Sequence, residues 1–386
     1  MLFKSAILIF PAVILGAAAA PSGNKIPILK HAGKVKENSY IIQLKPETSK
    51  STHLARLSDS KLVLTYTYEQ AFHGYAARLD SDSLESIRQS KDVEAIFEDG
   101  VMETDIAPSK GSSQSSSTTF DVSPENIRRV DGTSVDIYDI GTGIYTAHTS
   151  FGGRAHWGAT FGGVSTPIAS SVGVHALIFK PQYSNTDGNG YDTCLAGIAV
   201  GATYGVATQA NIYAVRAMSD SGTATISDII AAINWVISAV AASGRPSVAM
   251  LGSGGSVNTA LDSAVVSATN KGIHFIVPAP RSSDVGSTSP ARVASAVTVG
   301  VEGQSYTSLA GIDVCSKGTA VPCPAIQGPT ASTTITGAGA AMARVAGIVA
   351  AVLGTHGSTT PASMEAALKL HASTSSNGCL VINEPW

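Results

Sequence analysis

Four aspartates in two parts of the sequence have side chains that could do acid–base or metal chemistry. Asp136 and Asp139 lie in one apolar run, and Asp187 and Asp192 flank a later glycine-rich stretch. Paired carboxylates exchange protons or bind hard cations where the fold brings them together. Spacing alone does not show convergence, and a solvated or hydrogen-bonded carboxylate is the commoner outcome. The partners of Asp139 matter most, because a carboxylate inside a buried strand is costly unless it is paired.

The four cysteines of the sequence can serve as thiols or as disulfides. Cys315 and Cys323 are close enough along the chain for a disulfide across a local loop. Cys194 and Cys379 would then form a second pair or remain free thiols. Cys194 also lies near Tyr191, where a catalytic thiol is one interpretation and a buried structural cysteine is the commoner one.

The elements that must hold these residues alternate between strand and helix from residue 120 onward. The clearest helix has apolar residues at helical spacing within residues 229–240, and Gly244 with Pro246 ends it. Such alternation predicts an α/β fold, with a mostly parallel sheet and helices on both faces. Strands are expected at residues 135–140, 212–217, 248–251, 273–277 and 296–301, and helices at 193–198, 229–242, 340–353 and from Pro361.

A smaller α+β unit precedes this sheet. Residues 40–44 and 75–79 are predicted strands, and a short helix follows them with Ser81 or Asp82 as its cap. We expect this small domain to span residues 36–106.

A serine-rich segment separates the two units. Residues 107–119 (APSKGSSQSSSTT) have too few apolar side chains to order themselves, so we predict an exposed linker. The large domain should then span residues 120–386.

The first 20 residues have the layout of a secretory signal peptide. Lys4 precedes an apolar run at residues 6–15, and small residues follow at 16–20. A membrane anchor is the alternative, but the run is short for a bilayer span and contains Pro11. The sequence therefore predicts a secreted, extracellular protein after removal of residues 1–20.

Composition limits the classes of partner. The 386 residues are 44% hydrophobic and 14% charged, with a formal net charge of -3. No run of Lys and Arg stands out, so nothing indicates a nucleic-acid partner, or a membrane partner once the signal peptide is removed.

Short motifs in both units resemble those of one protease family. Residues 72–79 (FHGYAARL) and 92–98 (DVEAIFE) are similar to the end of an inhibitor I9-type propeptide. The large unit resembles the subtilases (peptidase family S8), particularly the proteinase K branch common among secreted fungal enzymes. Its matching motifs, in the family's order, are residues 142–144 (TGI), His148, residues 187–190 (DGNG), 204–207 (YGVA), 289–291 (SPA), 298–300 (TVG) and 345–347 (VAG).

The resemblance implies a serine nucleophile, a histidine base and an orienting aspartate, and all three positions are altered. Gly141 stands where the family has the aspartate before Thr-Gly, and Tyr191 stands at the first histidine of His-Gly-Thr-His. Gly339 stands at the serine of Gly-Thr-Ser-Met-Ala. Glycine offers neither carboxylate nor nucleophile, and a phenol with a pKa of about 10 is a poor base near neutral pH.

Two further family positions concern binding. Arg281 falls where the family has its oxyanion-hole asparagine, beside Pro278 and Pro280, which remove backbone N–H groups. The family binds peptides as an added strand along a segment that corresponds here to a glycine-rich stretch. The residues of this predicted groove are Leu251, Gly252, Ser253, Gly254 and Gly255.

Alternative assignments recover little of the triad. Asp139 becomes the orienting aspartate if the strand contains an insertion, but no histidine or serine accompanies it. His148 matches a histidine of the family that lies outside the triad. Many subtilases bind calcium, but the ligands include loops and carbonyls that cannot be carried over residue by residue, so no cofactor or metal is assigned.

The sequence therefore predicts a secreted pseudoprotease that acts by binding a protein or peptide. It should keep its propeptide-like domain as an intramolecular partner, because family propeptides are usually removed by the enzyme's own serine. One alternative is a hydrolase with relocated catalytic groups, which predicts titratable residues clustered in the old cleft. Another is a propeptide-like domain that inhibits related active proteases.

Overall fold

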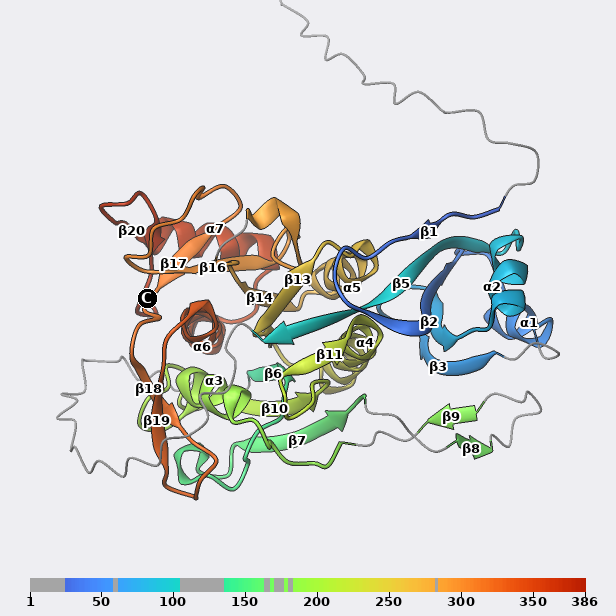
Figure 1. Cartoon of the computed structure of the whole chain (residues 1–386). Helices are drawn as coiled ribbons and strands as arrows, with labels where there is room; N and C mark the ends of the chain where they lie inside the picture. Colours follow the sequence, from blue (N-terminus) through green and yellow to red (C-terminus); the bar gives the residue numbers. More distant parts are fainter. Residues whose placement is uncertain are drawn as a thin grey trace, which may run out of the picture.

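A small antiparallel sheet and a large, mostly parallel sheet organise the chain (Figure 1). The structure is a computed structural model and describes residues 25–57, 62–104, 135–162, 167–169, 177–179, 183–281 and 284–386. The predicted signal peptide at residues 1–20 and the predicted linker at residues 107–119 lie outside the described residues.

In the N-terminal unit, β2 (Val35–Leu44) lies between β4 (Gly74–Arg78) and β5 (Val93–Thr104) and is antiparallel to both. β3 (Val63–Tyr68) pairs with the other edge of β4, and β1 (Ile28–Leu29) runs parallel to β5. Helices α1 (Lys50–Ala55) and α2 (Ser81–Arg88) complete the unit. Its core includes Ile42, Tyr75, Ile87 and Ile96, which are fully buried.

The cap of α2 lies one or two residues before the predicted position. Asp80 precedes the helix in an extended conformation, and its side chain accepts a hydrogen bond from the Ser83 backbone N–H. Ser81 and Asp82 instead lie within the first turn. Asp80 is favoured at this position because its carboxylate reaches a backbone donor that the helix leaves unpaired.

The large sheet has nine strands, and its order is β20-β21-β17-β16-β14-β12-β6-β10-β7. All neighbours are parallel except β20 and β21. The predicted α/β fold is confirmed. The strands are β6 (Asp136–Gly141), β7 (Ala155–Thr160), β10 (Asn211–Arg216), β12 (Ser247–Leu251), β14 (His274–Pro278), β16 (Val297–Val301), β17 (Val314–Ser316), β20 (Ser373–Thr374) and β21 (Leu380–Val381).

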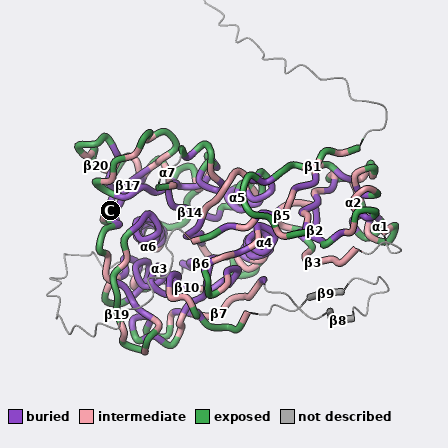
Figure 2. Tube along the Cα trace, in the orientation of Figure 1, coloured by how far each residue is buried: buried purple, intermediate pink, exposed green. Residues whose placement is uncertain are grey.

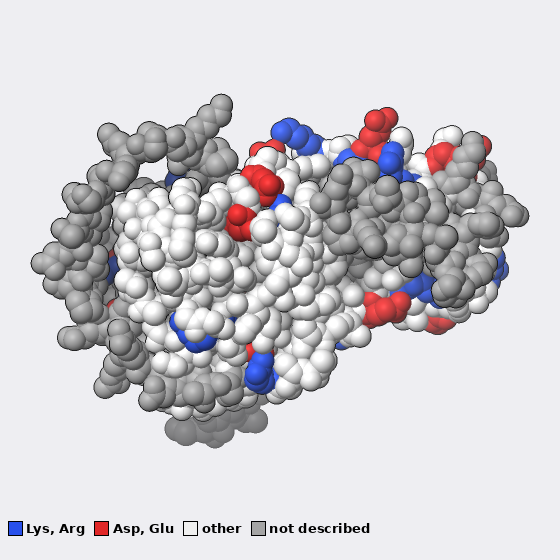
Figure 3. All heavy atoms as spheres, turned by 90° about the horizontal axis from the view of Figure 1, so that it is seen from below, with Lys and Arg blue, Asp and Glu red and all other residues white. Residues whose placement is uncertain are grey.

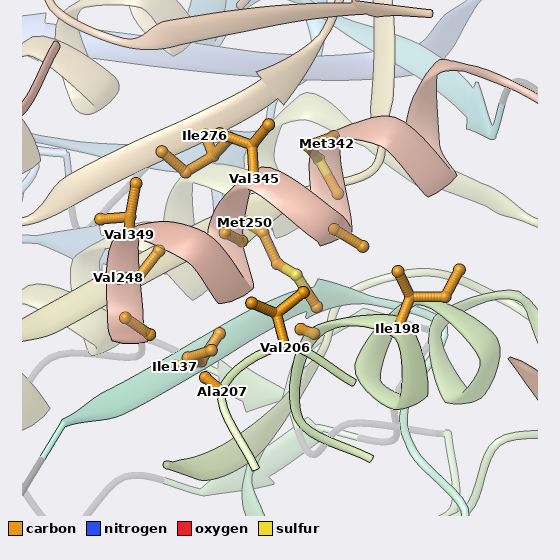
Figure 4. Packing of buried hydrophobic residues seen from close by; sticks show 14 of the residues in the cluster. Ile137, Ile198, Val206, Ala207, Val248, Met250, Ile276, Met342, Val345 and Val349 are labelled. Atoms are coloured by element: carbon orange, nitrogen blue, oxygen red, sulfur yellow. The ribbon is translucent and has the colours of Figure 1, made fainter. Parts of the chain in front are cut away.

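Helices cover both faces of this sheet because its strands carry apolar side chains on alternate sides. On β12, Met250 belongs to the core on one face of the sheet. The helices of that core are α3 (Tyr191–Val200), α6 (Ala338–His356) and α7 (Pro361–His371). Leu251 belongs to the core on the other face, with α4 (Ile226–Ser243) and α5 (Thr259–Asn270). Figure 4 shows Ile276 of β14 beside Val345 of α6. Figure 2 shows much of α3, α4 and α6 coloured as buried.

The longest helices are core helices. By length and composition α4 and α6 could each cross a membrane, but 56% and 89% of their apolar windows are buried inside the protein. A capping box joins Thr225 and Asp228 at the start of α4, and Gly244 ends it with a φ of 64°, which favours glycine.

Shorter elements lie around the two sheets. β13 (Ser253–Ser256) pairs with β15 (Thr288–Ser289), and β18 (Val321–Pro324) forms a hairpin with β19 (Ser332–Ile335). The others are β8 (Pro167–Ala169), β9 (Leu177–Phe179), β11 (Thr223–Thr225), and the 3-10 helices η1 (Thr149–Phe151) and η2 (Val285–Ser287).

Both disulfides differ from the pairing suggested by the sequence. Cys315 bonds to Cys379, and Cys194 bonds to Cys323, so the local Cys315–Cys323 disulfide is wrong. Cys315 is in β17, beside β21, which brings Cys379 across from it. Cys323 is in β18, which packs on α3 where Cys194 lies. Sheet and helix packing therefore override proximity along the chain, and neither Cys194 nor Cys379 is a free thiol.

The described surface shows no single-sign concentration of charge on the face drawn in Figure 3. Lys and Arg side chains there are scattered among Asp and Glu, and most atoms belong to uncharged residues. This face gives no support for a nucleic-acid or anionic-membrane partner.

Candidate functional site

The end of β5 pairs with two short strands of the large unit. Val101, Met102 and Glu103 pair antiparallel with β11, and Glu103 and Thr104 pair antiparallel with β13. The Thr104 N–H donates to the Gly222 carbonyl at 2.9 Å. Figure 1 shows β5 running from the small sheet to lie between β11 and β13. The chain therefore places its own strand where an added peptide strand would lie.

Three of the predicted groove residues meet this strand. Ser253 and Gly254 are opposite Thr104 and Glu103, and a Cβ added to Gly255 would lie 3.3 Å from the Met102 Cγ. Met102 itself is only 1% exposed. Leu251 belongs to β12 and the core, and the Gly252 carbonyl accepts a hydrogen bond from Tyr191.

Buried polar contacts hold the small unit against α4. The Asp99 carboxylate, fully buried, accepts from Ser39 Oγ, from the Ser227 N–H and from Ser227 Oγ at 2.7–2.9 Å. Burial raises the pKa of Asp99, and the Asp228 charge adds to this effect. The carboxylate lies at the N-terminus of α4, where the helix dipole favours negative charge.

A second contact uses one side-chain oxygen of α4 for three backbone donors. Asn234 Oδ1 accepts from the N–H groups of Glu69, Gln70 and Ala71 at 2.7–3.1 Å. Tyr66 Oη also donates to Asp228 Oδ1 at 2.7 Å. These bonds and the strand pairing make the N-terminal unit an intramolecular partner of the large one.

Tyr191 fills the space beside Gly339. Tyr191 begins α3, and its hydroxyl donates to the Gly252 carbonyl at 3.1 Å. Gly339 lies in the first turn of α6, and a Cβ added there would overlap the Tyr191 hydroxyl and lie 3.0 Å from Tyr191 Cζ. A side chain at position 339 and the phenol at position 191 therefore exclude each other.

Asp192 fills the space beside Gly141 in a similar way. A Cβ added to Gly141 would overlap the Asp192 carboxylate. The Thr142 N–H donates to Asp192 Oδ2, and the Asp192 N–H donates back to Thr142 Oγ1 at 3.4 Å. The carboxylate on helix α3 thus occupies the space that a side chain at the end of strand β6 would take.

Asp139 lies near Asp192 without a protein donor. Both residues are 1% exposed. No hydrogen-bond donor from the described residues reaches either carboxylate oxygen of Asp139 or Oδ1 of Asp192. Burial raises the pKa of Asp139 well above its usual range, and the neighbouring charges of Asp192 and Asp187 raise it further. Burial raises the pKa of Asp192 to about 7.

The other two aspartates have complete sets of partners. Asp187 accepts from the N–H groups of Asn189, Gly190 and Thr193 and from Thr193 Oγ1 at 2.6–3.1 Å. Asp136, at the start of β6, accepts from Arg245 Nε at 2.7 Å. The four aspartates of the sequence therefore do not form one site, although Asp139, Asp187 and Asp192 interact.

Comparison with known proteins decides the family. The sequence model of the Peptidase inhibitor I9 family matches residues 39–105. Subtilisin-like protease 2 of Pseudogymnoascus destructans is 31% identical over 316 residues, which are 76% of this chain and 71% of that protein. The chain belongs to the subtilisin-like serine protease family.

Two other subtilisin-like proteins show the extent of the likeness. The crystal structure of a cold-adapted subtilisin-like serine proteinase is 32% identical, with a TM-score of 0.56 over 67% of this chain and 91% of that chain. Alkaline serine exoprotease A of Vibrio alginolyticus is 33% identical over 80% of this chain. That match covers 56% of the Vibrio protein, so the chain spans little more than half the length of this relative.

The structure brings the three expected triad positions of this subtilisin-like chain to buried sites beside the groove. Gly141 ends β6, and Tyr191 and Gly339 face each other across the first turns of α3 and α6. Asp192 is the residue whose importance the sequence analysis missed. The sequence held only a partial signal, which is that Asp192 replaces the small glycine of the family's His-Gly-Thr-His motif.

Two further predicted residues lie apart from any catalytic arrangement. Arg281 follows β14 and is exposed. His148 is buried, where it accepts from the Ser150 N–H at 3.1 Å through Nδ1 and therefore donates through Nε2 to the Ala331 carbonyl at 2.8 Å. These bonds give His148 a structural role in the loop around η1.

A cavity of about 160 Å³ opens beside Tyr191, between α3 and the β18–β19 hairpin. Its walls include Asn189, Cys194, Ile326 and Thr334, and Tyr191 is the only titratable side chain among them apart from the disulfide-bonded Cys194. Within the described part of the chain, no group of three or more His, Cys, Asp or Glu residues is placed to hold a metal ion.

Proposed function

We propose that this chain is a secreted subtilisin-like pseudoprotease, whose serine-protease chemistry is lost and which acts by binding. One observation carries the proposal: the spaces beside Gly141 and Gly339 are filled by Asp192 and Tyr191. A site that had lost only its reactive groups would leave these spaces empty. Here neighbouring side chains have taken them, so the pocket cannot accept a nucleophile at position 339 without rearrangement.

The remaining parts of the serine mechanism support the same conclusion. Tyr191 uses its hydroxyl proton in a bond to the Gly252 carbonyl, so it is not directed at a nucleophile. Arg281, at the expected oxyanion position, is exposed and follows Pro280. An exposed arginine that follows a proline does not supply the preorganised donor on which stabilisation of an acyl-transfer oxyanion depends.

A serine-directed phosphonate provides the test of lost chemistry. We expect no covalent adduct in the intact mass and no hydrolysis of casein or a peptide panel. The matched control is an active subtilase treated in parallel. An adduct on a single serine, with hydrolysis that the reagent silences, would overturn the proposal.

The alternative of relocated catalytic groups has one structural candidate, the carboxyl pair of Asp139 and Asp192. Each side chain is 1% exposed, so neither reaches a substrate in the groove. If the pair were catalytic, hydrolysis would appear at acid pH and disappear in Asp139→Asn. We expect no hydrolysis at pH 4 in either protein.

Secretion is part of the proposal. Two disulfides among the four cysteines fit an oxidising compartment. The segment at residues 1–20 has the composition of a signal peptide.

We expect refolded protein to keep both units in one uncut chain. The family's propeptides are usually removed by the enzyme's own serine, and position 339 is glycine. Intact-mass analysis after refolding, with no other protease present, checks this expectation. Self-cleavage between residues 105 and 134, at a rate independent of protein concentration, would show that a functional nucleophile exists.

Binding is the positive part of the proposal, and the filled groove limits it. A peptide partner must displace residues 101–104, which already make antiparallel ladders on both sides. The bound strand is linked covalently, so its effective concentration is high. Partners are therefore expected to bind the intact surface or to act after the strand has been released.

A further inference from the structure

The buried carboxyl groups of Asp139 and Asp192 interact, so the charge of one opposes ionisation of the other. Asp139 lies on the face of β6 that packs against α3, and Asp192 projects from the first turn of α3. Both are about as buried as the apolar core around them. Two facing carboxylates in such surroundings repel each other and lose their hydration, so one of them takes up a proton.

The hydrogen bonds around the pair leave room for one shared proton. Asp192 Oδ2 accepts from the Thr142 N–H, which leaves Oδ1 without a donor among the described residues. Both oxygens of Asp139 also lack one. Three buried acceptor oxygens with no donor are satisfied best if one carboxyl is protonated and donates to the other. We infer that Asp139 and Asp192 hold one structural proton between them in the folded protein at neutral pH.

The groups that face this pair do not offset its charge. Asp187, in the turn before α3, adds a further negative charge that acts on both residues. Arg216 is opposite Gly141 on β10, but its guanidinium donates to the Ser184, Thr186 and Met218 carbonyls and to Asp220. On α6, Arg344 pairs with Glu384, and at the start of α4 Asp228 accepts from Tyr66. No described cation therefore replaces the proton.

The shared proton makes stability depend on pH in a defined direction. The pKa values of Asp139 and Asp192 are raised in the folded protein, whereas an unfolded aspartate titrates near about 3.9. Between about pH 4 and about pH 7 the folded state thus binds more protons than the unfolded chain. The unfolding equilibrium constant rises with pH across this window, by at most about tenfold per pH unit for one excess proton.

The pH dependence of wild-type stability does not isolate the effect of the carboxyl pair. Burial lowers the pKa of His274 to about 4, from a usual value of 6.5. A buried neutral histidine stabilises the protein less as the pH falls through that range, which opposes the effect of the carboxyl pair. A difference between matched variants is therefore the quantity to measure.

Asp139→Asn provides that difference. Its amide can donate to Asp192 and replaces the shared proton at every pH. Urea unfolding of both proteins from pH 4 to pH 7 should show the ratio of the wild-type to the variant unfolding constant rising by at least about thirtyfold. Glu37→Gln, at an exposed position, is the control and should leave the ratio constant.

Two further measurements keep the inference testable. At pH 7 the infrared spectrum should contain the carbonyl stretch of a protonated carboxylic acid that Asp139→Asn lacks. If Asp139→Asn does not fold, Asp192→Asn supplies the same comparison. The inference of a shared proton would be overturned if the ratio of unfolding constants stayed constant with pH, or if the carboxylic-acid band were absent. A difference that a chelator abolishes would also overturn it, because a bound cation would then be the partner of the pair.

Discussion

Gly339→Ser should lower the free energy of unfolding by about 2–3 kcal/mol, because forcing an extra group into a packed core strains its neighbours. The new Cβ would overlap the Tyr191 hydroxyl, and Tyr191 is only 6% exposed. The same serine should cost much less in a Tyr191→His background, where the shorter ring leaves that space open. Chemical denaturation of the two single variants and the double variant gives the coupling energy, which we expect to be about 2 kcal/mol.

A matched control separates overlap from the general effect of replacing glycine. At Gly328 an added Cβ meets no atom within 4 Å, so Gly328→Ser should be close to neutral. A second double-mutant cycle combines Gly141→Ala with Asp192→Gly, and its coupling free energy should have the same sign. Additive effects at both pairs would mean that Tyr191 and Asp192 do not occupy the spaces that side chains at positions 339 and 141 would need.

Removal of the Cys194–Cys323 disulfide should have the largest effect on stability. The two cysteines are separated by 129 residues. Loop-closure entropy for a ring of that length predicts that the double variant Cys194→Ala, Cys323→Ala loses about 5 kcal/mol of unfolding free energy. Urea unfolding under oxidising conditions measures the loss.

The second disulfide supplies the comparison. Cys315 and Cys379 are separated by 64 residues, so the corresponding double variant should lose about 4 kcal/mol. Peptide mapping of the non-reduced protein should recover both pairings. A peptide that links Cys315 to Cys323, or a loss below about 1 kcal/mol in both variants, would contradict the arrangement of β17, β18 and α3.

The fold could be predicted from the sequence because its signals are local. Short apolar runs between helical segments predicted β6, β10, β12, β14 and β16, and helical spacing with Gly244 predicted α4. The cap of α2 was predicted one or two residues too late, because Asp80, Ser81 and Asp82 are all good caps and only the backbone conformation distinguishes them.

Contacts between distant segments could not be predicted in the same way. The disulfide pairing depends on how β18 packs on α3 and how β21 joins β17, which spacing along the chain does not contain. The sequence predicted that Gly141 and Gly339 lack reactive groups. It did not show that Asp192 and Tyr191 fill the neighbouring space, because that requires the positions of two helices relative to a strand.

The occupied groove affects how loss of activity must be measured. Residues 101–104 would block a substrate even if the site beneath them were active. Inactivity of the uncut chain is therefore consistent with an inhibited enzyme as well as with a pseudoprotease. The two are distinguished only when the strand is free to leave.

The most direct test of lost chemistry uses protein cut by a site-specific protease at a recognition sequence placed within residues 107–119. Hydrolysis of a broad peptide library is measured before and after cutting, from about pH 4 to about pH 9, a range that spans the ordinary titration of histidine. The account predicts no hydrolysis in either sample. Hydrolysis that appears after cutting and is abolished by a serine-directed inhibitor would contradict it.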